Sequence, residues 1–344
     1  MNPWDPVTAT RTSSSYERIR AMRYVDVAGE HLSVIGVGAW QFGSREWSYG
    51  DEYANSTAIE IVHRALDLGV NLLDTAEVYG FGNSERIVGR AIADRRDRAF
   101  VASKLLPVVP PIGPGFIESR AKKSMDRLGL DVLDLYQVHW PNPALPKRTL
   151  ADGLRRLIET DLVRHVGVSN YSRSGWESLE KELGSTILSN QVQYSLAVRK
   201  PDRELVPYAQ QHDRLIIAYS PLAQGLLGAK YDADNVPRDL RRNNSLFLPE
   251  NLERAAPLLD ALRDVARSHD ATPAQVALAW VVRRPNVIAI PGASSVAQLE
   301  ANAAAADLDL TDEDDARLTE ASDAFQPVRG PAAVPKLITN RLKR

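Results

Sequence analysis

The sequence contains no cysteine and no long apolar run. Without cysteine the chain can form no disulfide, no thiolate zinc site and no cysteine nucleophile, which suits a reducing cytoplasm. Its longest apolar stretches fall well short of the roughly 18 residues that a membrane-spanning helix needs. The first 20 residues also lack the apolar core of a signal peptide. The sequence therefore predicts a soluble, cytoplasmic protein without a membrane partner.

An excess of charge of either sign is also missing. The 344 residues include 42 lysines and arginines and 44 aspartates and glutamates, which gives a formal net charge of −2. This balance predicts no nucleic acid or other polyanionic partner. With 44% hydrophobic residues, the chain is long enough to bury a substantial core. These numbers leave the oligomeric state unknown.

The glycine-rich turn that binds dinucleotides in Rossmann folds is absent as well. The pair Gly36 and Gly38 is only a fragment of the G-x-G-x-x-G fingerprint, and an ordinary strand-end turn explains it better. What is present is a regular alternation of apolar, strand-like runs with amphipathic helical stretches. The eight strand candidates are residues 33–39, 70–75, 98–104, 132–140, 163–169, 187–194, 214–220 and 286–292.

This alternation predicts a (β/α)8 TIM barrel, an α/β fold in a single domain. Eight strands that alternate with helices are what the barrel requires, whereas a doubly wound open sheet usually has fewer strands. We expect the barrel to span residues 21–325. It would follow a disordered segment of residues 1–20 and precede a C-terminal tail of residues 326–344.

Helical stretches fill the gaps between the strand candidates. Residues 54–69 carry apolar side chains near helical spacing, and Gly69 can end that helix. Residues 115–131 have a similar pattern, and another helix is expected to begin near Ser295. Free backbone N–H groups at such a helix start can receive a phosphate group.

Four polar residues lie at or just beyond the ends of successive strand candidates. Asp74, Lys104 and His139 close the second, third and fourth strands, and Tyr79 lies in the loop after Asp74. In a TIM barrel the chemistry gathers at the carboxyl ends of the strands. Each residue alone has an ordinary explanation as a turn cap, a packing ring, a solvated charge or a structural histidine. Together, in this order, they predict a proton-transfer site.

Several segments of the chain resemble the aldo-keto reductase superfamily. The resemblance covers roughly residues 22–325 and is nearer to bacterial reductases and potassium-channel β-subunits than to the aldose reductase branch. It implies a TIM barrel that binds a nicotinamide dinucleotide without a Rossmann fold, and an active site of Asp, Tyr, Lys and His. The segments that carry it are LLDTAEVYGFGNSE, VASK, DLYQVHW, HVGVSNY, NQVQYS, YSPLAQGLLGAKY and PGASSVAQLEAN, which contain Asp74, Tyr79, Lys104 and His139.

The chemistry of these four residues suits an oxidoreductase that reduces aldehydes or ketones to alcohols. Hydride addition makes an alkoxide, so an acid must deliver a proton, and Tyr79 is the expected general acid. A free tyrosine, with a pKa of about 10, is a reluctant donor, so the Lys104 ammonium is expected to stabilise its phenolate. Asp74 would keep that ammonium charged and oriented. His139 would hydrogen-bond the substrate carbonyl.

The resemblance also implies NADP(H) as cofactor, with NAD(H) as the alternative. Ser169, Asn170 and Gln191 match positions that hold the nicotinamide carboxamide, because hydroxyl and amide groups can donate and accept. Tyr194 and Tyr219 compete for the position of the ring that stacks on the nicotinamide. The other implied contacts are Gly38, Ala39, Trp40, Asp74, Ser220, Pro221, Leu222, Ala223, Gln224, Lys230, Gly292, Ser294, Gln298 and Asn302.

Positions that could meet the 2′-phosphate bear on the choice between NADP(H) and NAD(H). The superfamily often has Lys where this chain has Gly292 and Arg where it has Gln298, a departure that weakens the case for NADPH. Arg238, Arg241 or Arg242 would instead meet the 2′-phosphate, as basic residues of that loop do in the channel-subunit branch, or the run is a solvated face. With Arg238 in that role, NADPH is the favoured cofactor.

The substrate pocket is less defined by the sequence than the catalytic residues. Trp40, Trp47, Tyr79, His139 and Trp140 are expected to line it. Aromatic and apolar walls suit a small-molecule carbonyl or alcohol with a hydrophobic body. The physiological substrate and the direction of hydride flow are not indicated.

Two other functional classes are weaker alternatives. A module that senses NADP(H) and docks on a partner protein, as channel β-subunits do, often lacks the active-site histidine, whereas His139 is present here. A sugar-phosphate isomerase or a metal-dependent hydrolase on the same fold needs a carboxylate base opposite a phosphate site or a metal cluster. The 6 histidines of the chain show no ligand spacing, so no metal site is predicted.

Overall fold

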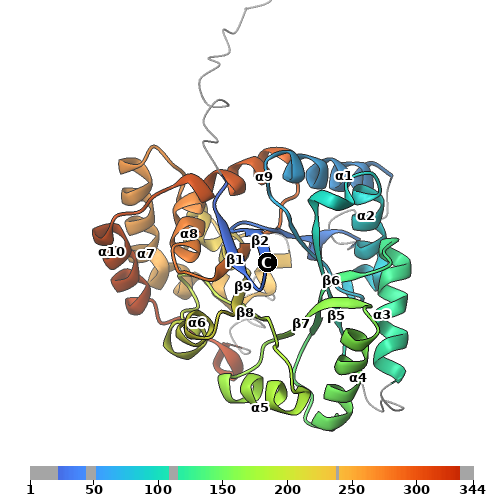
Figure 1. The fold of residues 1–344 in the computed structure, drawn as a ribbon. Coiled ribbons are helices and arrows are strands. Elements are labelled where there is room, and N and C mark those ends of the chain that lie inside the picture. The colour runs from blue at the N-terminus through green and yellow to red at the C-terminus, as the bar shows by residue number, and fades with distance from the viewer. Residues whose placement is uncertain (1–21, 44–51, 108–114, 238–239, 334–344) are drawn as a thin grey trace, which may run out of the picture.

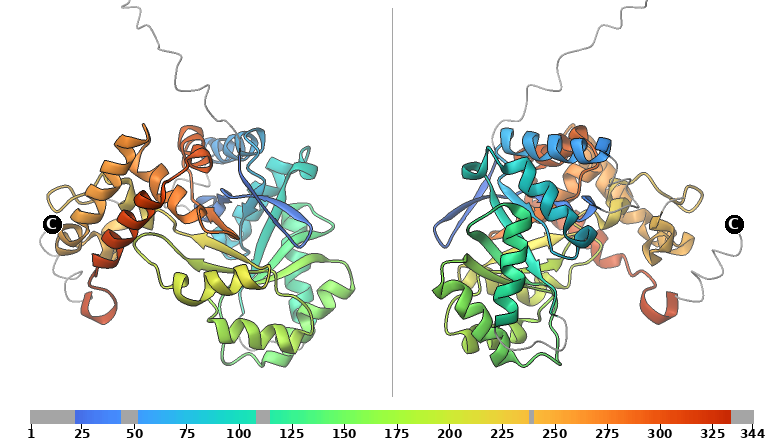
Figure 2. Two further views of the ribbon diagram at one scale, coloured as in Figure 1. Left: turned by 60° about the vertical axis from the view of Figure 1, so that its left-hand side comes forward. Right: turned by 90° about the vertical axis from the view of Figure 1, so that its right-hand side faces the viewer.

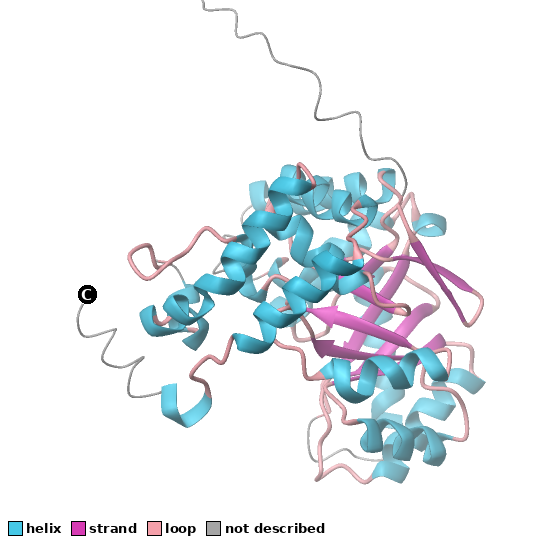
Figure 3. Cartoon of the chain, turned by 90° about the vertical axis from the view of Figure 1, so that its left-hand side faces the viewer, coloured by secondary structure: helices cyan, strands magenta, loops and turns pink. Residues whose placement is uncertain are grey.

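The computed structural model describes residues 22–43, 52–107, 115–237 and 240–333, and its main body is a barrel (Figure 1). Eight parallel strands follow one another in chain order around a single sheet. The remaining seam is bridged where Ile35 pairs with Ala289 and Gly36 N donates to Ala289 O at 2.8 Å. The predicted (β/α)8 TIM barrel is therefore confirmed, and Figure 3 shows its strands enclosed by helices.

All eight predicted barrel strands are confirmed, although the first is much shorter than expected. β3 can lie close to the end of β10 because residue 38 is a glycine. A Cβ on Gly38 would lie only 2.7 Å from Ile290 O. The strands are β3 (Val37–Gly38), β4 (Leu72–Asp74), β5 (Phe100–Leu105), β6 (Leu133–Val138), β7 (Val163–Ser169), β8 (Ser189–Gln193), β9 (Leu215–Tyr219) and β10 (Val287–Ile290).

Helices surround the barrel, and neighbours along the chain pack side by side (Figure 2). The helices predicted for residues 54–69 and 115–131 are confirmed as α1 and α3, and Gly69 follows α1 with a φ of 80°. No helix within the described ranges is long and apolar enough to cross a membrane. The helices are α1 (Glu52–Asp67), α2 (Asn83–Ile92), α3 (Gly115–Leu128), α4 (Lys147–Glu159), α5 (Arg173–Leu183), α6 (Pro201–Gln211), α7 (Pro249–Ser268), α8 (Pro273–Val282), α9 (Val296–Ala303) and α10 (Asp312–Ala324).

An antiparallel hairpin of β1 (Tyr24–Val27) and β2 (Glu30–Ser33) lies across one end of the barrel (Figure 1). Asn71, just before β4, ties the hairpin to the amino ends of the strands through bonds to Ser33 N and His31 O, of 2.8 and 2.7 Å. This hairpin was not predicted from the sequence, whose apolar pattern placed Ser33 in the first barrel strand. Its strands have only four residues each and carry charged side chains on the solvent face, so their apolar signal is weak.

The two ends of the barrel interior differ in polarity. At the amino end, Leu32 of the hairpin joins an apolar cluster with residues that begin several strands, such as Leu72, Phe100 and Leu215. At the carboxyl end the buried side chains are polar. They include Asp74, Lys104, Gln137, His139, Ser169 and Gln191. Because burying polar groups is costly unless they are paired, this concentration marks the carboxyl end as the place of a functional site.

The described part of the predicted tail, residues 326–333, is attached to α7. Asn251 is fully buried, and its side chain exchanges two hydrogen bonds with the Val328 backbone, of 2.8 and 3.0 Å. The predicted disordered segment, residues 1–20, lies outside the described residues, as do residues 334–344. The proposed domain limits of 21 and 325 therefore stay predictions.

Candidate active site

Asp74, Tyr79 and Lys104 form a hydrogen-bonded cluster at the carboxyl ends of β4 and β5. Lys104 Nζ donates to Asp74 Oδ1 at 2.5 Å, to Thr75 O at 2.9 Å and to Tyr79 OH at 3.2 Å. The strand register pairs Asp74 with Ala102, so Lys104 lies two residues further along the same face of the sheet. The structure thus brings three of the four predicted catalytic residues into direct contact.

The electrostatics of the cluster favour a charged lysine beside a neutral tyrosine. Burial lowers the pKa of Lys104, but Asp74 and Tyr79 together outweigh it, so the pKa lies above its usual value. Burial also raises the pKa of Tyr79, an effect that Lys104 opposes and Asp74 reinforces. At neutral pH Tyr79 therefore holds a proton that it can give away. The adjacent ammonium lowers the cost of the phenolate left behind.

His139 follows β6 and faces Tyr79. The two ring centroids lie 5.7 Å apart with an interplanar angle of 78°, and the imidazole stacks on Trp140 at 3.8 Å. Its Nδ1 is buried and has no hydrogen-bond partner among the described residues. Burial, with the Lys104 charge nearby, lowers the pKa of His139 to about 3. The imidazole is therefore neutral at physiological pH and can donate one hydrogen bond without carrying charge.

The low pKa of His139 predicts a loss of stability in acid. The unfolded chain binds a proton at a pKa of about 6.5, and the folded chain does so only near a pKa of about 3. The contribution of the neutral imidazole to the free energy of unfolding is therefore fully present above pH 6.5. It decreases as the pH falls toward 3. Between pH 7.5 and 4.5 we expect wild type to lose roughly 2 kcal/mol more unfolding free energy than His139→Asn. Urea unfolding at both pH values measures this, and equal losses would contradict the assignment.

Two glutamines hold the second oxygen of Asp74. Gln191 Nε2 donates to Asp74 Oδ2 at 2.7 Å, and Gln137 Nε2 does so at 3.3 Å. Gln191 had been expected to contact a cofactor only. Gln137 was missed, although it lies two residues before His139 on one strand and so shares its face. With Lys104 on Oδ1, both oxygens of this buried carboxylate are occupied, which fixes its orientation.

The expected nicotinamide contacts lie together beside His139. Ser169 Oγ donates to Gln191 O at 2.9 Å. Asn170 Nδ2 donates to His139 O at 3.3 Å, and Tyr219 OH donates to Asn170 Oδ1 at 3.0 Å. Asn170 has a φ of 61°, a left-handed conformation that asparagine tolerates better than most residues. Neighbouring strands β7, β8 and β9 therefore present hydroxyl and amide groups next to the catalytic candidates.

The structure separates the two candidate stacking tyrosines. Tyr194 is fully buried, donates to Asp202 and packs against Trp280, so its ring belongs to the core behind the barrel. Tyr219 ends β9, is partly exposed and bonds to Asn170. Of the two rings, only that of Tyr219 lies where a ligand at the strand ends could reach it.

The remaining cofactor candidates follow β3, β9 and β10 at the same end. Gly38 N donates to Pro291 O at 3.1 Å, which places Gly38, Ala39 and Trp40 beside the loop after β10. The segment Ser220, Pro221, Leu222, Ala223 and Gln224 continues from β9, with positive φ at Ser220, Ala223 and Gln224. Lys230 lies further along this loop and is exposed. Trp47 and Arg238 lie outside the described residues, and the structure describes no side chain for Arg242.

The helix predicted to begin near Ser295 is confirmed as α9. Ser295 Oγ caps the helix by accepting from Gln298 N at 3.2 Å. Gln298 Oε1 in turn accepts from Ser294 N and Oγ, at 2.9 and 3.0 Å, and Asn302 Nδ2 bonds Gly292 O at 3.4 Å. Gln298 thus stabilises the turn at the start of α9. This role was not predicted from the sequence.

Gly292 lies against the side-chain amide of Gln41. A Cβ there would lie 2.8 Å from Gln41 Oε1, a buried acceptor with no hydrogen-bond partner among the described residues. The lysine that the superfamily often has at this position would therefore require Gln41 to move.

Aromatic rings border the catalytic cluster. Trp40 and Trp140 are 52% and 44% exposed, and Phe81 in the loop after Tyr79 is 97% exposed. Exposed rings beside a polar cluster are typical of a pocket that takes a ligand with an apolar body. Within the described ranges, no three His, Asp or Glu side chains are grouped so as to hold a metal ion.

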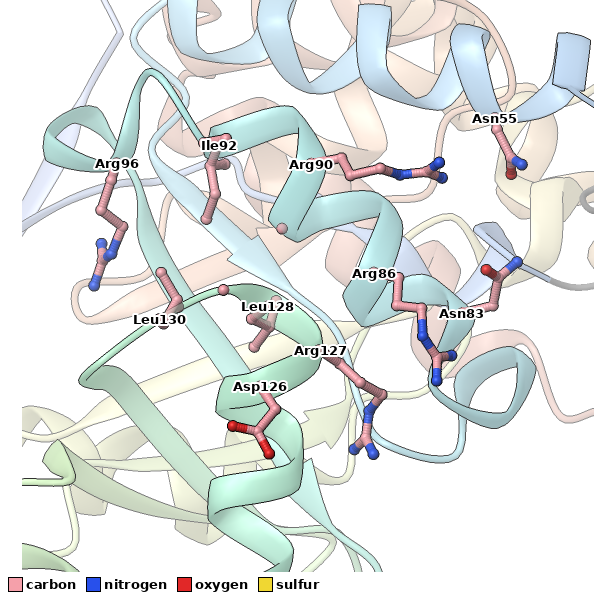
Figure 4. Close-up of a pocket in the computed structure, with 13 residues that line it drawn as sticks. Asn55, Asn83, Arg86, Arg90, Ile92, Arg96, Asp126, Arg127, Leu128 and Leu130 are labelled. Carbon is pink, nitrogen blue, oxygen red and sulfur yellow. The ribbon is translucent and has the colours of Figure 1, made fainter.

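A hollow of about 600 Å³ lies away from this cluster, on the outer surface between α1, α2 and α3 (Figure 4). Arg86, Arg90, Arg96 and Arg127 line it, and none of the four catalytic candidates does. Asp126 faces the same hollow, and Arg96 is paired with Asp134. We therefore place the candidate active site at the carboxyl ends of the strands, where the polar groups converge.

Known proteins resemble this chain over most of its length. The sequence profile of the Aldo/keto reductase family matches residues 34–323. An uncharacterized oxidoreductase of Mycobacterium tuberculosis is 49% identical over 94% of this chain and 100% of its own length. The chain belongs to the aldo/keto reductase family.

Solved structures give the same result. Glycerol dehydrogenase from Gluconobacter oxydans superposes with a TM-score of 0.79 at 30% identity, over 90% of this chain and 97% of its own. An aldo/keto reductase from Klebsiella pneumoniae, in complex with NADP and acetate, superposes with a TM-score of 0.71 at 28% identity, over 90% of this chain and 98% of its own.

Proposed function

We propose that this protein is an NADP(H)-dependent oxidoreductase that reduces aldehydes or ketones to alcohols, with Tyr79 as general acid and, in reverse, general base. The observation that carries the proposal is the contact of Lys104 Nζ with both Tyr79 OH, at 3.2 Å, and Asp74 Oδ1, at 2.5 Å. A tyrosine beside a buried, charged lysine can both lose and regain a proton at neutral pH.

The residues at the strand ends fit a dinucleotide. Hydroxyl and amide groups of Ser169, Asn170 and Gln191 can bond a carboxamide, and the Tyr219 ring can stack on it. The segments 219–231 and 291–299, which would run along the phosphates, contain no aspartate or glutamate. Backbone N–H groups at the start of α9 suit an anion. The Klebsiella relative binds NADP, which supports the choice of NADP(H).

The catalytic residues then have separate tasks. When bound, the dinucleotide supplies the hydride. Tyr79 and His139 orient the substrate oxygen between the phenol and the neutral imidazole. Tyr79 gives its proton to that oxygen as negative charge develops there, and Lys104 stabilises the phenolate. Asp74, held by Gln137 and Gln191, keeps Lys104 charged and in place.

The exposed aromatic side chains around the site indicate which kind of substrate it could take. Trp40, after β3, and Trp140 present exposed rings, and the imidazole of His139 stacks on Trp140. Such walls favour a carbonyl compound whose body is apolar. We propose that this activity operates in the cytoplasm, as the composition of the chain predicts.

Dinucleotide binding followed by turnover tests this function. NADPH and NADH are titrated separately into the purified protein while intrinsic tryptophan fluorescence is recorded. Aldehydes and ketones are then added and absorbance at the nicotinamide band is followed. We expect tight NADPH binding and oxidation of NADPH that depends on the carbonyl. Tight binding without turnover of any carbonyl would favour the sensing module instead, and failure to bind either dinucleotide would reject the proposal.

A further inference from the structure

Two buried glutamates, Glu77 and Glu85, lie on either side of Tyr79 in the chain and have no part in the mechanism above. Glu77 is 8% exposed and Glu85 is 0% exposed. A buried carboxylate is costly unless charged groups and hydrogen-bond donors surround it. The partners of these two side chains therefore indicate what the two residues are for.

Each glutamate accepts one hydrogen bond from β5 or its end and one from an arginine. Glu77 Oε1 accepts from Leu106 N at 2.6 Å, and its Oε2 accepts from Arg120 Nε at 2.7 Å. Glu85 Oε1 accepts from Ser103 Oγ, and its Oε2 accepts from Arg127 Nε, each at 2.5 Å. All four carboxylate oxygens are thus bonded.

The donors are arranged around Lys104. Ser103 directly precedes Lys104 on β5, and Leu106 N follows it by two residues. The two arginines lie on α3, seven residues and so two turns apart, on one face of that helix. Glu77 and Glu85 therefore fasten the loop that carries Tyr79 to the strand that carries Lys104, one on each side of the Tyr79–Lys104 contact.

The loop between the two glutamates is confined on its other side as well. Gly80 has a φ of 55°, and a Cβ there would lie 2.4 Å from Gly43 O. Thr75 Oγ1 and Ser84 Oγ are 2.8 Å apart, and Ser84 Oγ donates to Ala39 O at 2.8 Å. The loop is therefore held on this side as well as by the two glutamates.

We propose that Glu77 and Glu85 are positioning residues that set the distance between Tyr79 OH and Lys104 Nζ. The inference rests on the proposed function, since it concerns the proton that Tyr79 delivers. Misplacement of a catalytic group by about 1 Å can cost about 100-fold in rate. A purely structural role would instead lower stability and leave the rate per folded molecule unchanged.

Asp134, on the neighbouring strand β6, offers a matched control. Its side chain is 1% exposed, and its Oδ2 accepts from Val101 N at 2.7 Å and lies 2.8 Å from Arg96 Nη2. Like Glu77, Asp134 is a buried carboxylate that binds an arginine and a backbone N–H of β5 or its end. It does so near the amino end of β5, away from Tyr79 and Lys104. A second arginine, Arg164, also pairs with it, at 3.2 Å.

The test compares Glu77→Ala, Glu77→Gln and Asp134→Ala in the full-length protein with NADPH and an aldehyde substrate. For Glu77→Ala we expect kcat to fall roughly 10- to 100-fold, with the Kd for NADPH within about twofold of wild type. The pH profile of kcat should move to higher pH, because Lys104 lowers the pKa of Tyr79 less when the two are further apart. Glu77→Gln keeps an acceptor for Leu106 N and should recover most of the rate.

Asp134→Ala should keep kcat per folded molecule within about twofold of wild type while lowering stability.

Hydrogen–deuterium exchange adds a readout that needs no turnover. Exchange of residues 75–82 should accelerate in Glu77→Ala and stay at the wild-type rate in Asp134→Ala. If Glu77→Ala does not fold, Ser103→Ala removes one donor to Glu85 while sparing its pair with Arg127, and the same shifts in kcat and exchange are expected there.

Wild-type kcat in Glu77→Ala, or an equal loss of kcat in Asp134→Ala, would overturn the inference. The failure of the proposed function is recognisable separately, because then wild type itself would reduce no carbonyl. In that case the exchange of residues 75–82 decides whether Glu77 positions the loop. Unchanged exchange in Glu77→Ala would reject the positioning role on its own.

Discussion

Replacing Tyr79 by phenylalanine is expected to lower kcat by about 100- to 10,000-fold, the contribution that a general acid usually makes. The substitution deletes one hydroxyl and changes little volume, so the barrel should fold as before. The lost hydroxyl lies 3.2 Å from Lys104 Nζ, and no other acidic group of the cluster can take its place at neutral pH. NADPH should still bind, because the proposed cofactor contacts other than Asp74 lie on other strands and loops.

The measurement is kcat and the fluorescence-derived Kd for NADPH in Tyr79→Phe and in a control, Tyr171→Phe. Tyr171 is also buried, which raises its pKa to about 12, and it lies after β7 outside the catalytic cluster. Its substitution deletes the same hydroxyl group and should leave kcat within about twofold. Turnover near the wild-type rate in Tyr79→Phe would remove Tyr79 from the mechanism.

Replacing Lys104 by methionine is expected to lower kcat by at least about 100-fold. Methionine keeps the length of the side chain but removes the charge that stabilises the phenolate, so the pKa of Tyr79 should rise further above its usual value. The alkaline side of the kcat profile should then move to higher pH. The kcat–pH profile of the variant, compared with that of wild type, measures this coupling.

A second effect of Lys104→Met must be separated from the first. The substitution leaves Asp74 as a buried carboxylate without its cation, which can cost about 3–5 kcal/mol of stability. The double variant Asp74→Asn/Lys104→Met relieves that penalty and still lacks the ammonium. We expect it to regain stability but not turnover. An unchanged pH profile in the single variant, or restored turnover in the double variant, would refute the role of Lys104.

The barrel could be predicted from the sequence because each of its strands is a buried, apolar run between turn residues. The run at residues 132–140, for example, has a core that the structure buries completely as β6. The hairpin of β1 and β2 could not be predicted in this way. Its strands have only four residues each, too few for a clear pattern, and their burial does not alternate along the chain.

The residues of the candidate site that lie at strand ends could be predicted from their positions in the sequence. Asp74, Lys104 and His139 close consecutive strands, and the barrel geometry alone brings such residues together. Gln137 and Glu77 were missed because their importance depends on which atoms they bond in three dimensions. A buried glutamate and an exposed one look alike in a sequence. The alternation within β6 was the one available signal for Gln137.

The complete burial of Lys104 also affects how its chemistry can be detected. Acylating reagents that survey reactive amines need a neutral amine that a reagent molecule can reach. Lys104 has no exposed side-chain surface, and its pKa is raised by Asp74 and Tyr79 against the effect of burial. Labelling experiments on the folded protein should therefore modify the surface lysines and pass over this one. The lysine closest to the chemistry would be among the least reactive in the protein.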